Sequence, residues 1–176
     1  IKQNDVLSSW FDSFSNQFHS RKVWQYLEVP EEGCFKDIRD EKVDDEEKAF
    51  DRVFSIGGKT GWYYADFLWR IRGFLDKLFG GVGLRRGRRN MNSLEAVDSV
   101  DFWRVLYANR EEKRLLLFAE MKLPGEAWLE FKIKDGVLHQ EATFRPLGLS
   151  GRLYWYSVLP FHGLIFNGML KKLAGK

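Results

Sequence analysis

The sequence predicts an α+β protein in which helices are segregated from one antiparallel sheet. Three observations carry this prediction. Residues 44–78 have apolar residues at helical spacing, residues 98–144 alternate with a period of two, and a mostly apolar segment, 153–170, follows the strands. Helices that come before and after a run of consecutive strands are typical of α+β domains. A chain of 176 residues is long enough for one such domain with a sizeable core.

Two helices are predicted ahead of the main run of strands, and a first strand is expected over 33–43. Asp44 and Asp45 begin the first helix, through EEKAFDRVF, because acidic residues are favourable in a first turn. The second helix has Thr60 as its expected N-cap. Its apolar stripe, at spacings of three and four, consists of Tyr64, Phe67, Leu68, Ile71, Phe74, Leu75 and Leu78.

Four antiparallel strands are predicted from DSVDFWRVLYA, KRLLLFAEMK, EAWLEFKI and VLHQEATF. Asp135-Gly136 is a hairpin signal, and pairing across it places Phe131 opposite Gln140 and Leu129 opposite Ala142. The inner face is then Ala127, Leu129, Phe131, Ile133, Leu138, Gln140, Ala142 and Phe144. Gln140 is the polar member of this face, and a buried amide needs hydrogen-bond partners.

The segment LYWYSVLPFHGLIFNGML is predicted to form a long helix laid across the sheet. Its eighteen residues reach the short limit for a membrane span, but Ser157, Pro160, His162 and Asn167 interrupt it. A buried helix is therefore favoured, because a helix that is apolar on all sides requires burial. Attachment to a membrane surface is a second interpretation of the same pattern.

Two glycine clusters resemble phosphate-binding loops but fail their spacing. Gly58-Lys59-Thr60 would need a glycine at the position of Val53, which lies in the first predicted helix. Gly81-x-Gly83 would need a small residue where Arg86 stands, and a preceding strand where a helix is predicted. Neither cluster is expected to bind a nucleotide.

Charge and cysteine content restrict the compartment and the partners. A single Cys34 excludes an internal disulfide and fits a cytoplasmic location, and the three histidines lack the spacing of metal ligands. Residues 1–50 carry 7 basic and 12 acidic residues, a net −5, whereas 59–89 carry 8 basic and 2 acidic, a net +6. The acidic first part argues against nucleic acid. An anion, or another domain, is expected to dock at Arg85, Arg86, Arg88 and Arg89.

Several long segments resemble one known family. GGKTGWYYADFLWRIRGFLDKLFGGVGLRRGRR, DFWRV, AEMKLPGEAWLEF and GRLYWYSVLPFHGLIFNGM are similar to a bacterial domain of the START-like, polyketide-cyclase (SRPBCC) superfamily. The resemblance implies a helix-grip fold over 29–176, a curved antiparallel sheet wrapped around a long C-terminal helix. It also implies a preceding Rossmann domain of the atypical short-chain dehydrogenase or nucleoside-diphosphate-sugar epimerase type. Residues 1–28 would then be a linker or the tail of that domain, which would bind NAD(P). No cofactor is expected in 29–176.

Aromatic residues make up 16% of the chain, and they serve either as core or as walls of a pocket. The residues expected to bind a hydrophobic small molecule are Trp62, Tyr63, Trp69, Gln140, Tyr154, Trp155, Tyr156 and Phe161. His162, with Glu120 or Glu130 as partner, is a candidate general base. Against this role, Glu120 is also placed to form a cross-strand ion pair with Arg104.

The leading functional expectation is a ligand-binding module that works beside an epimerase-like domain and is not catalytic by itself. Two alternatives stay open. One is an enzyme, cyclase-like or a dehydrogenase partner, that uses His162 and cavity carboxylates. The other is a docking or membrane-surface domain without a ligand.

Overall fold

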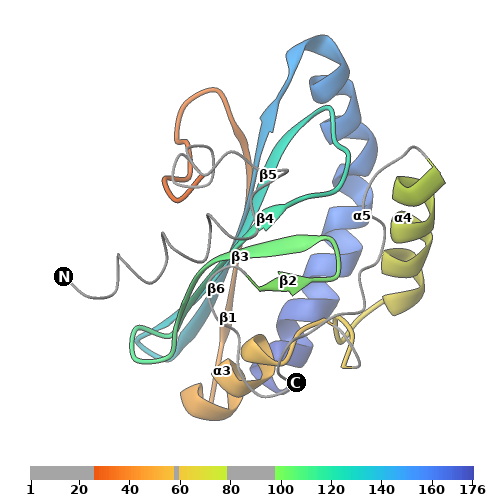
Figure 1. The fold of residues 1–176 in the computed structure, drawn as a ribbon. Helices are drawn as coiled ribbons and strands as arrows, with labels where there is room; N and C mark the ends of the chain where they lie inside the picture. The colour runs from red at the N-terminus through yellow and green to blue at the C-terminus, as the bar shows by residue number, and fades with distance from the viewer. Residues whose placement is uncertain (1–25, 58–59, 79–97) are drawn as a thin grey trace.

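The computed structural model describes residues 26–57, 60–78 and 98–176, which form a six-stranded antiparallel sheet and helices packed on one of its faces (Figure 1). In chain order the elements are β1 (Phe35–Lys42), α3 (Glu46–Phe54), α4 (Asp66–Leu78), β2 (Ser99–Val100), β3 (Trp103–Asn109), β4 (Arg114–Ala119), β5 (Gly125–Lys134), β6 (Val137–Pro146) and α5 (Gly148–Ala174). The strand order is β1-β6-β5-β4-β3-β2, so the first strand pairs with the last. The predicted α+β helix-grip fold is confirmed.

The β5–β6 hairpin has the predicted register. Phe131 lies opposite Gln140, and Leu129 lies opposite Ala142. Asp135 and Gly136 both have positive φ, 52° and 73°, which is the geometry of a type I′ turn. The alternation then directs Leu129, Phe131, Ile133 and Leu138 to the inner face, where all are buried.

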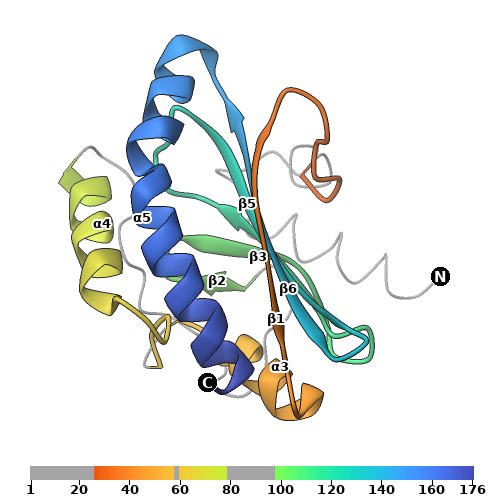
Figure 2. The same cartoon turned by 180° about the vertical axis from the view of Figure 1, so that it is seen from behind.

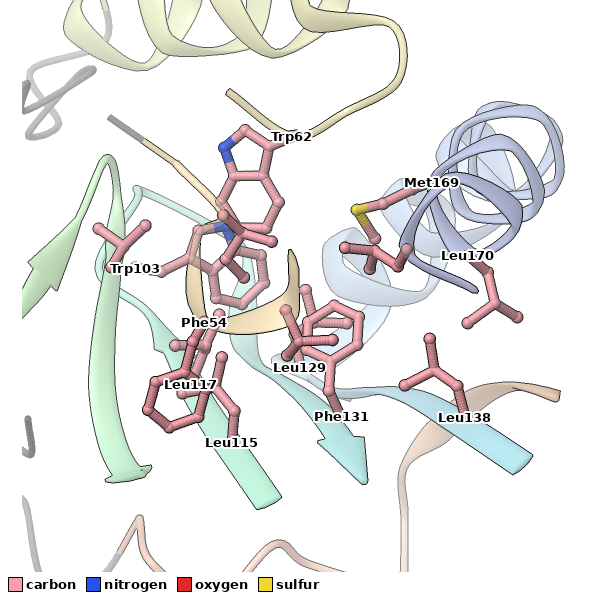
Figure 3. Packing of buried hydrophobic residues seen from close by; sticks show 14 of the residues in the cluster. Phe54, Trp62, Trp103, Leu115, Leu117, Leu129, Phe131, Leu138, Met169 and Leu170 are labelled. Carbon is pink, nitrogen blue, oxygen red and sulfur yellow. The ribbon is translucent and has the colours of Figure 1, made fainter. Parts of the chain in front are cut away.

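Helix α3 closes one end of the sheet. The predicted helix start is confirmed, but Asp45 lies at the N-cap and not in the first turn. Its side chain accepts a hydrogen bond from the backbone N–H of Lys48 at 3.1 Å. Its buried residues, Ala49, Phe50, Val53 and Phe54, join the main core. Figure 3 shows Phe54 together with strand residues such as Leu117 and Phe131, and with Met169 of α5, in one continuous cluster.

Helix α5 crosses the inner face of the sheet (Figure 2), and its C-terminal half completes the core. The predicted helix is correct but longer than 153–170, and Pro160 lies inside it. The expectation of burial on every side is wrong. Leu149, Leu153, Tyr156 and Leu164 are 57% to 72% exposed, because no described element covers this side of the helix.

Helix α4 also forms where predicted, but the opposite face is buried. Phe67, Ile71, Phe74 and Leu78 of its apolar stripe are 51% to 68% exposed. The face that packs inward carries Trp69, which stacks on Trp62 with ring centroids 4.6 Å apart. The buried face is therefore the one whose tryptophan has an aromatic partner, and the longer apolar stripe is exposed.

Thr60 does not cap α4, because the helix begins six residues later, at Asp66. The intervening turn is held by an antiparallel bridge between Gly57 and Gly61 and by Asp66, whose Oδ1 accepts a hydrogen bond from the Trp62 backbone N–H at 2.7 Å. Gly58 and Lys59, the rest of the rejected phosphate-loop motif, lie outside the described residues.

Candidate ligand cavity

A cavity of about 290 Å³ lies between the inner face of the sheet, α4 and the N-terminal half of α5. Its volume is close to the lower end of small-molecule pockets, about 300–1,000 Å³. Its walls are formed by Leu68, Trp69, Ile71, Trp103, Met121, Leu123, Ala127, Trp128, Ala142, Thr143, Phe144, Tyr154, Trp155, Val158, Phe161, His162, Ile165 and Phe166. None of these is a carboxylate, a lysine or an arginine.

The cavity exists because α5 contacts the sheet closely only near its two ends. At the N-terminal end, a Cβ added to Gly151 would lie 2.4 Å from the carbonyl oxygen of Pro124, so the helix backbone touches the sheet there. At the other end, Met169 and Leu173 are fully buried in the core. Between these anchors the floor of the cavity includes two small residues, Ala127 and Ala142. Larger neighbours such as Phe131 and Leu138 fill the core beneath the C-terminal half of α5.

One wall of the cavity is a stack of rings that links the sheet to α5. Trp155 lies between Phe35 and Phe144, with centroids 5.5 and 5.8 Å apart and nearly parallel planes. His162, two turns further along α5, meets the Trp155 ring edge-on at 5.1 Å. Such contacts fix ring positions through the preferred geometry of aromatic pairs, so this wall is preformed.

The opposite wall is a second aromatic group built from α4 and the β2–β3 corner. Trp69 lies 5.8 Å from Phe102, and Trp103 lies 6.1 Å from both Phe102 and Trp62. Trp62 itself is turned away from the cavity, and its Nε1–H donates to Asp101 Oδ2 at 2.8 Å. Trp69 and Trp103 thus line the cavity, and Trp62 packs against both of their rings from the side of the core.

His162 is an ionisable side chain of the cavity wall, and burial lowers its pKa below the ordinary value. The Asp37 carboxylate on β1 opposes this shift, with its Oδ2 4.0 Å from His162 Nδ1. That carboxylate already forms an ion pair with Arg39 at 2.8 Å. The His162 imidazole is therefore neutral near pH 7, and Asp37 is only a distant neighbour of it.

The structure brings five of the residues singled out by sequence to the cavity, namely Trp69, Tyr154, Trp155, Phe161 and His162. It places Trp62, Tyr63, Gln140 and Tyr156 elsewhere. Trp62 and Tyr63 belong to the core and its margin, and Tyr156 is 61% exposed. Gln140 is completely buried, and its amide finds no hydrogen-bond partner among the described residues.

The carboxylates considered as partners of His162 are engaged elsewhere. Glu120 pairs with Arg104 at 2.5 Å, as the cross-strand alternative predicted, and Glu130 pairs with Arg114 at 2.5 Å. Arg85, Arg86, Arg88 and Arg89 lie outside the described residues. Within the part of the chain that the structure describes, no group of side chains has the composition of a metal site.

Sequence reasoning missed two kinds of wall residue. Trp103 carries no distinct sequence signal, because an aromatic residue at the start of a strand serves equally well as core or as a pocket wall. Ala127 and Ala142 lie on the inner face as predicted, and their small size is the sequence signal that indicates a cavity there. A helix with the length and apolar character needed to cross a membrane is not found among the described residues.

Comparison with known proteins gives a family and two distant structural likenesses. The model of a family described as "Protein of unknown function (DUF2867)" matches residues 31–169. Among solved structures, the crystal structure of Ara h 8.0201 is 10% identical, covers 82% of this chain and 100% of its own, and has a TM-score of 0.41. A conserved protein of unknown function from Enterococcus faecalis is 9% identical, covers 86% of this chain and 81% of its own, and has a TM-score of 0.39. No curated protein matches the chain.

Proposed function

We propose that this chain, which belongs to the DUF2867 family, binds an apolar small molecule in the cavity between α5, α4 and the sheet. The observation that carries the proposal is the cavity itself, whose walls are almost entirely apolar and aromatic. Transfer of apolar surface from water into such a site is favourable by about 25 cal/mol per Å². A preformed, ring-lined space is therefore a binding site without further rearrangement.

Binding is favoured over catalysis by the state of the candidate catalytic groups. A general base needs a partner to orient it and a reacting group within about 3 Å. His162 has its nearest carboxylate, Asp37, at 4.0 Å, and that carboxylate is held by Arg39. Glu120 is held by Arg104. We propose accordingly that the domain carries or senses its ligand, and that any redox chemistry belongs to an epimerase-like domain in the same polypeptide.

Binding is tested by placing a larger side chain on the sheet side of the cavity, so that the space for a ligand is filled. Ala142→Leu adds three carbons at a position that is 7% exposed and lines the cavity. We expect the dissociation constant for the neutral apolar dye Nile red to rise at least tenfold, with little change in melting temperature. Tyr156→Ala, on the exposed side of α5, is the matched control and should leave the dissociation constant unchanged. Equal dye binding by the native protein and Ala142→Leu would overturn the proposal.

A second function is favoured by a separate observation, the exposed apolar face shared by α4 and α5. It consists of Phe67, Ile71, Phe74, Leu78, Leu149, Leu153, Tyr156, Leu159, Phe161 and Leu164, each at least 41% exposed. Soluble monomers rarely expose an apolar patch of this extent unless it is an interaction site. We propose that this face rests on a membrane surface that contains anionic lipid.

The charge of the residues near this face favours an anionic membrane surface over a protein partner. Helix α5 contains no acidic residue over its 27 positions, and Arg70 and Arg152 are exposed beside the apolar face. The segment 59–89 carries 8 basic and 2 acidic residues. Each basic residue near an anionic surface contributes about 1 kcal/mol, in addition to the inserted apolar side chains. A membrane position would also set Ile71 and Phe161, which line the cavity, next to the lipid.

Sedimentation with vesicles tests this second function. We expect binding to vesicles of mixed phosphatidylcholine and phosphatidylglycerol, weaker binding to phosphatidylcholine alone, and loss of binding in Phe67→Ser with Phe74→Ser. Ile38→Ser is the matched control, because Ile38 is 62% exposed but lies on β1, away from this face. Failure to sediment with either vesicle would assign the face to a protein partner instead.

A further inference from the structure

The cavity carries two buried hydrogen-bond donors that have no acceptor. Nε1 of Trp69 and Nε1 of Trp103 are inaccessible and find no partner among the described residues. Their side chains are only 9% and 5% exposed, and both line the cavity. An indole N–H can only donate, and a donor that is buried without an acceptor destabilises a protein.

Two other buried tryptophans in the same protein show that this is not a general property of its indoles. Trp62 donates to Asp101 Oδ2 at 2.8 Å, and Trp128 donates to the backbone oxygen of Tyr26 at 2.9 Å. These two nitrogens point to protein acceptors. Among the described residues, the inaccessible indole nitrogens without an acceptor are those of Trp69 and Trp103, on one wall of the proposed binding site.

We infer that the ligand is a neutral apolar molecule with an oxygen acceptor, such as the carbonyl of a ketone, ester or quinone. This oxygen accepts hydrogen bonds from the indole N–H groups of Trp69 and Trp103. This inference rests on the proposed binding function. Both indoles belong to one aromatic group around Trp62 and Phe102, so they act at the same end of the cavity. A carbonyl oxygen has two lone pairs and accepts from two donors.

The surroundings exclude an anionic acceptor. Among the residues that the structure describes, no lysine or arginine lines the cavity, and His162 is neutral near pH 7 because burial lowers its pKa. A carboxylate without a cationic partner loses far more hydration free energy on burial than two neutral hydrogen bonds return. The ligand is therefore an apolar body with a neutral polar end, and a fatty acid anion is a poor fit.

Three probes of one shape test this inference: fluorene, its ketone fluorenone, and the anion of fluorene-9-carboxylic acid. Their dissociation constants are measured by displacement of Nile red from the native protein. We expect fluorenone to bind between about fivefold and a hundredfold more tightly than fluorene, which is the range for two hydrogen bonds of ordinary net strength. The carboxylate should bind more weakly than either.

Variants assign the preference to the two indoles. In Trp69→Phe and in Trp103→Phe, a ring is kept and the donor is lost, so the ratio of fluorene to fluorenone dissociation constants should fall toward one. Phe166→Leu changes another cavity wall without removing a donor, and should leave this ratio as in the native protein. Because the readout is a ratio within each variant, a change in cavity size cancels.

The outcomes separate the inference from the function on which it rests. If fluorene and fluorenone bind equally to the native protein, the indole N–H groups do not donate to the ligand and the inference is wrong, while the binding function stands. If the carboxylate binds most tightly, the assignment of a neutral group is wrong. If no probe displaces the dye but Ala142→Leu weakens dye binding, the inference fails and the proposed function stands. If Ala142→Leu leaves dye binding unchanged as well, both fail.

Discussion

The two halves of helix α5 are built from equally apolar sequence but meet the protein differently. Residues 165–174 bury Phe166, Met169, Leu170, Leu173 and Ala174 in the main core. Residues 148–164 bury only Gly151 and Trp155, bridge the cavity and expose their leucines. One continuous helix therefore supplies stability at one end and a binding surface at the other.

The two ends of helix α5 also differ in how their backbone groups are capped. At the C-terminal end Gly175, with φ 96°, allows a Schellman-type cap in which Lys176 N–H bonds to Lys171 O at 2.9 Å. Arg52 Nε also donates to Leu173 O at 2.7 Å. At the N-terminal end Leu147 provides no side-chain cap. The N-terminal end is instead held by the Leu147 N–H, which donates to Pro124 O at 2.9 Å, and by the close approach of Gly151 to Pro124 and Pro146.

The largest difference in stability between the two halves is expected when a leucine of each half is truncated to alanine. Leu173→Ala removes a fully buried side chain from the core and should lower the free energy of unfolding by about 2–5 kcal/mol. Leu153→Ala removes one that is 62% exposed and should change it by no more than about 0.5 kcal/mol. Urea unfolding of both variants measures the difference. Similar losses would show that the N-terminal half is packed as tightly as the other.

A second prediction concerns Gly168, in the packed half. A Cβ at this position would lie 2.4 to 2.5 Å from atoms of the Tyr64 ring, so Gly168→Ala forces that ring to move. We expect a loss of about 1–3 kcal/mol, the usual cost of overpacking, in spite of the better helix propensity of alanine. The combined variant Gly168→Ala with Tyr64→Ala should recover part of this loss. A stabilised Gly168→Ala would contradict the close packing of this half.

The pH dependence of stability should report the cavity wall through His162. Burial lowers its pKa in the folded state, so the unfolded chain takes up a proton more readily. This contribution to stability is complete above the unfolded pKa of about 6.5, and it is lost as the pH falls below that value toward the folded pKa. The slope is at most about 1.4 kcal/mol per pH unit for one proton.

Comparison of variants isolates that slope from the titration of carboxylates. His162→Gln should flatten the loss of stability as the pH falls below 6.5. His139→Gln, at a half-buried histidine on β6 outside the cavity, is the comparison variant. Asp37 and Arg39 act on His162 in opposite directions, and Asp37→Asn should enlarge the effect by removing the opposing charge. An identical pH profile for His162→Gln and the native protein would mean that the imidazole is solvated.

The sequence could predict what depends on local chemistry and alternation. Asp45 as a cap, the Asp135-Gly136 turn and the facing of Phe131 and Gln140 all follow from short-range rules, and the structure has all of them. The approximate extents of α4 and α5 follow equally from the spacing and content of apolar residues. These features depend on a few neighbouring residues, so no knowledge of the rest of the molecule is needed.

The faces of the helices and the position of the cavity could not be predicted in this way. Helix α4 offers a long apolar stripe and a face with Trp69, and the second is buried because Trp69 packs on Trp62 and Phe102. The neighbour of His162 is Asp37, far away in sequence, rather than the nearer Glu120. A cavity forms where the side chains are too small to fill the space between two elements. Ala127 and Ala142 therefore indicate a cavity only when the distance between α5 and the sheet is known.

The smallest expected effect comes from replacing glycine by alanine in the N-terminal half of α5. It is informative because the same replacement in the C-terminal half should change the stability in the opposite direction. Gly163, unlike Gly168, has no atom within 4 Å of where a Cβ would lie. Gly163→Ala therefore meets no obstacle, and should stabilise the protein by about 0.5–1 kcal/mol through reduced backbone freedom in the unfolded chain. Gly163 does not line the cavity, so the affinity for Nile red should stay the same. Urea unfolding and dye titration of Gly163→Ala, beside Gly168→Ala, give both quantities. A destabilised Gly163→Ala would mean that something covers this side of α5 in solution, and the helix would then be packed alike along its whole length.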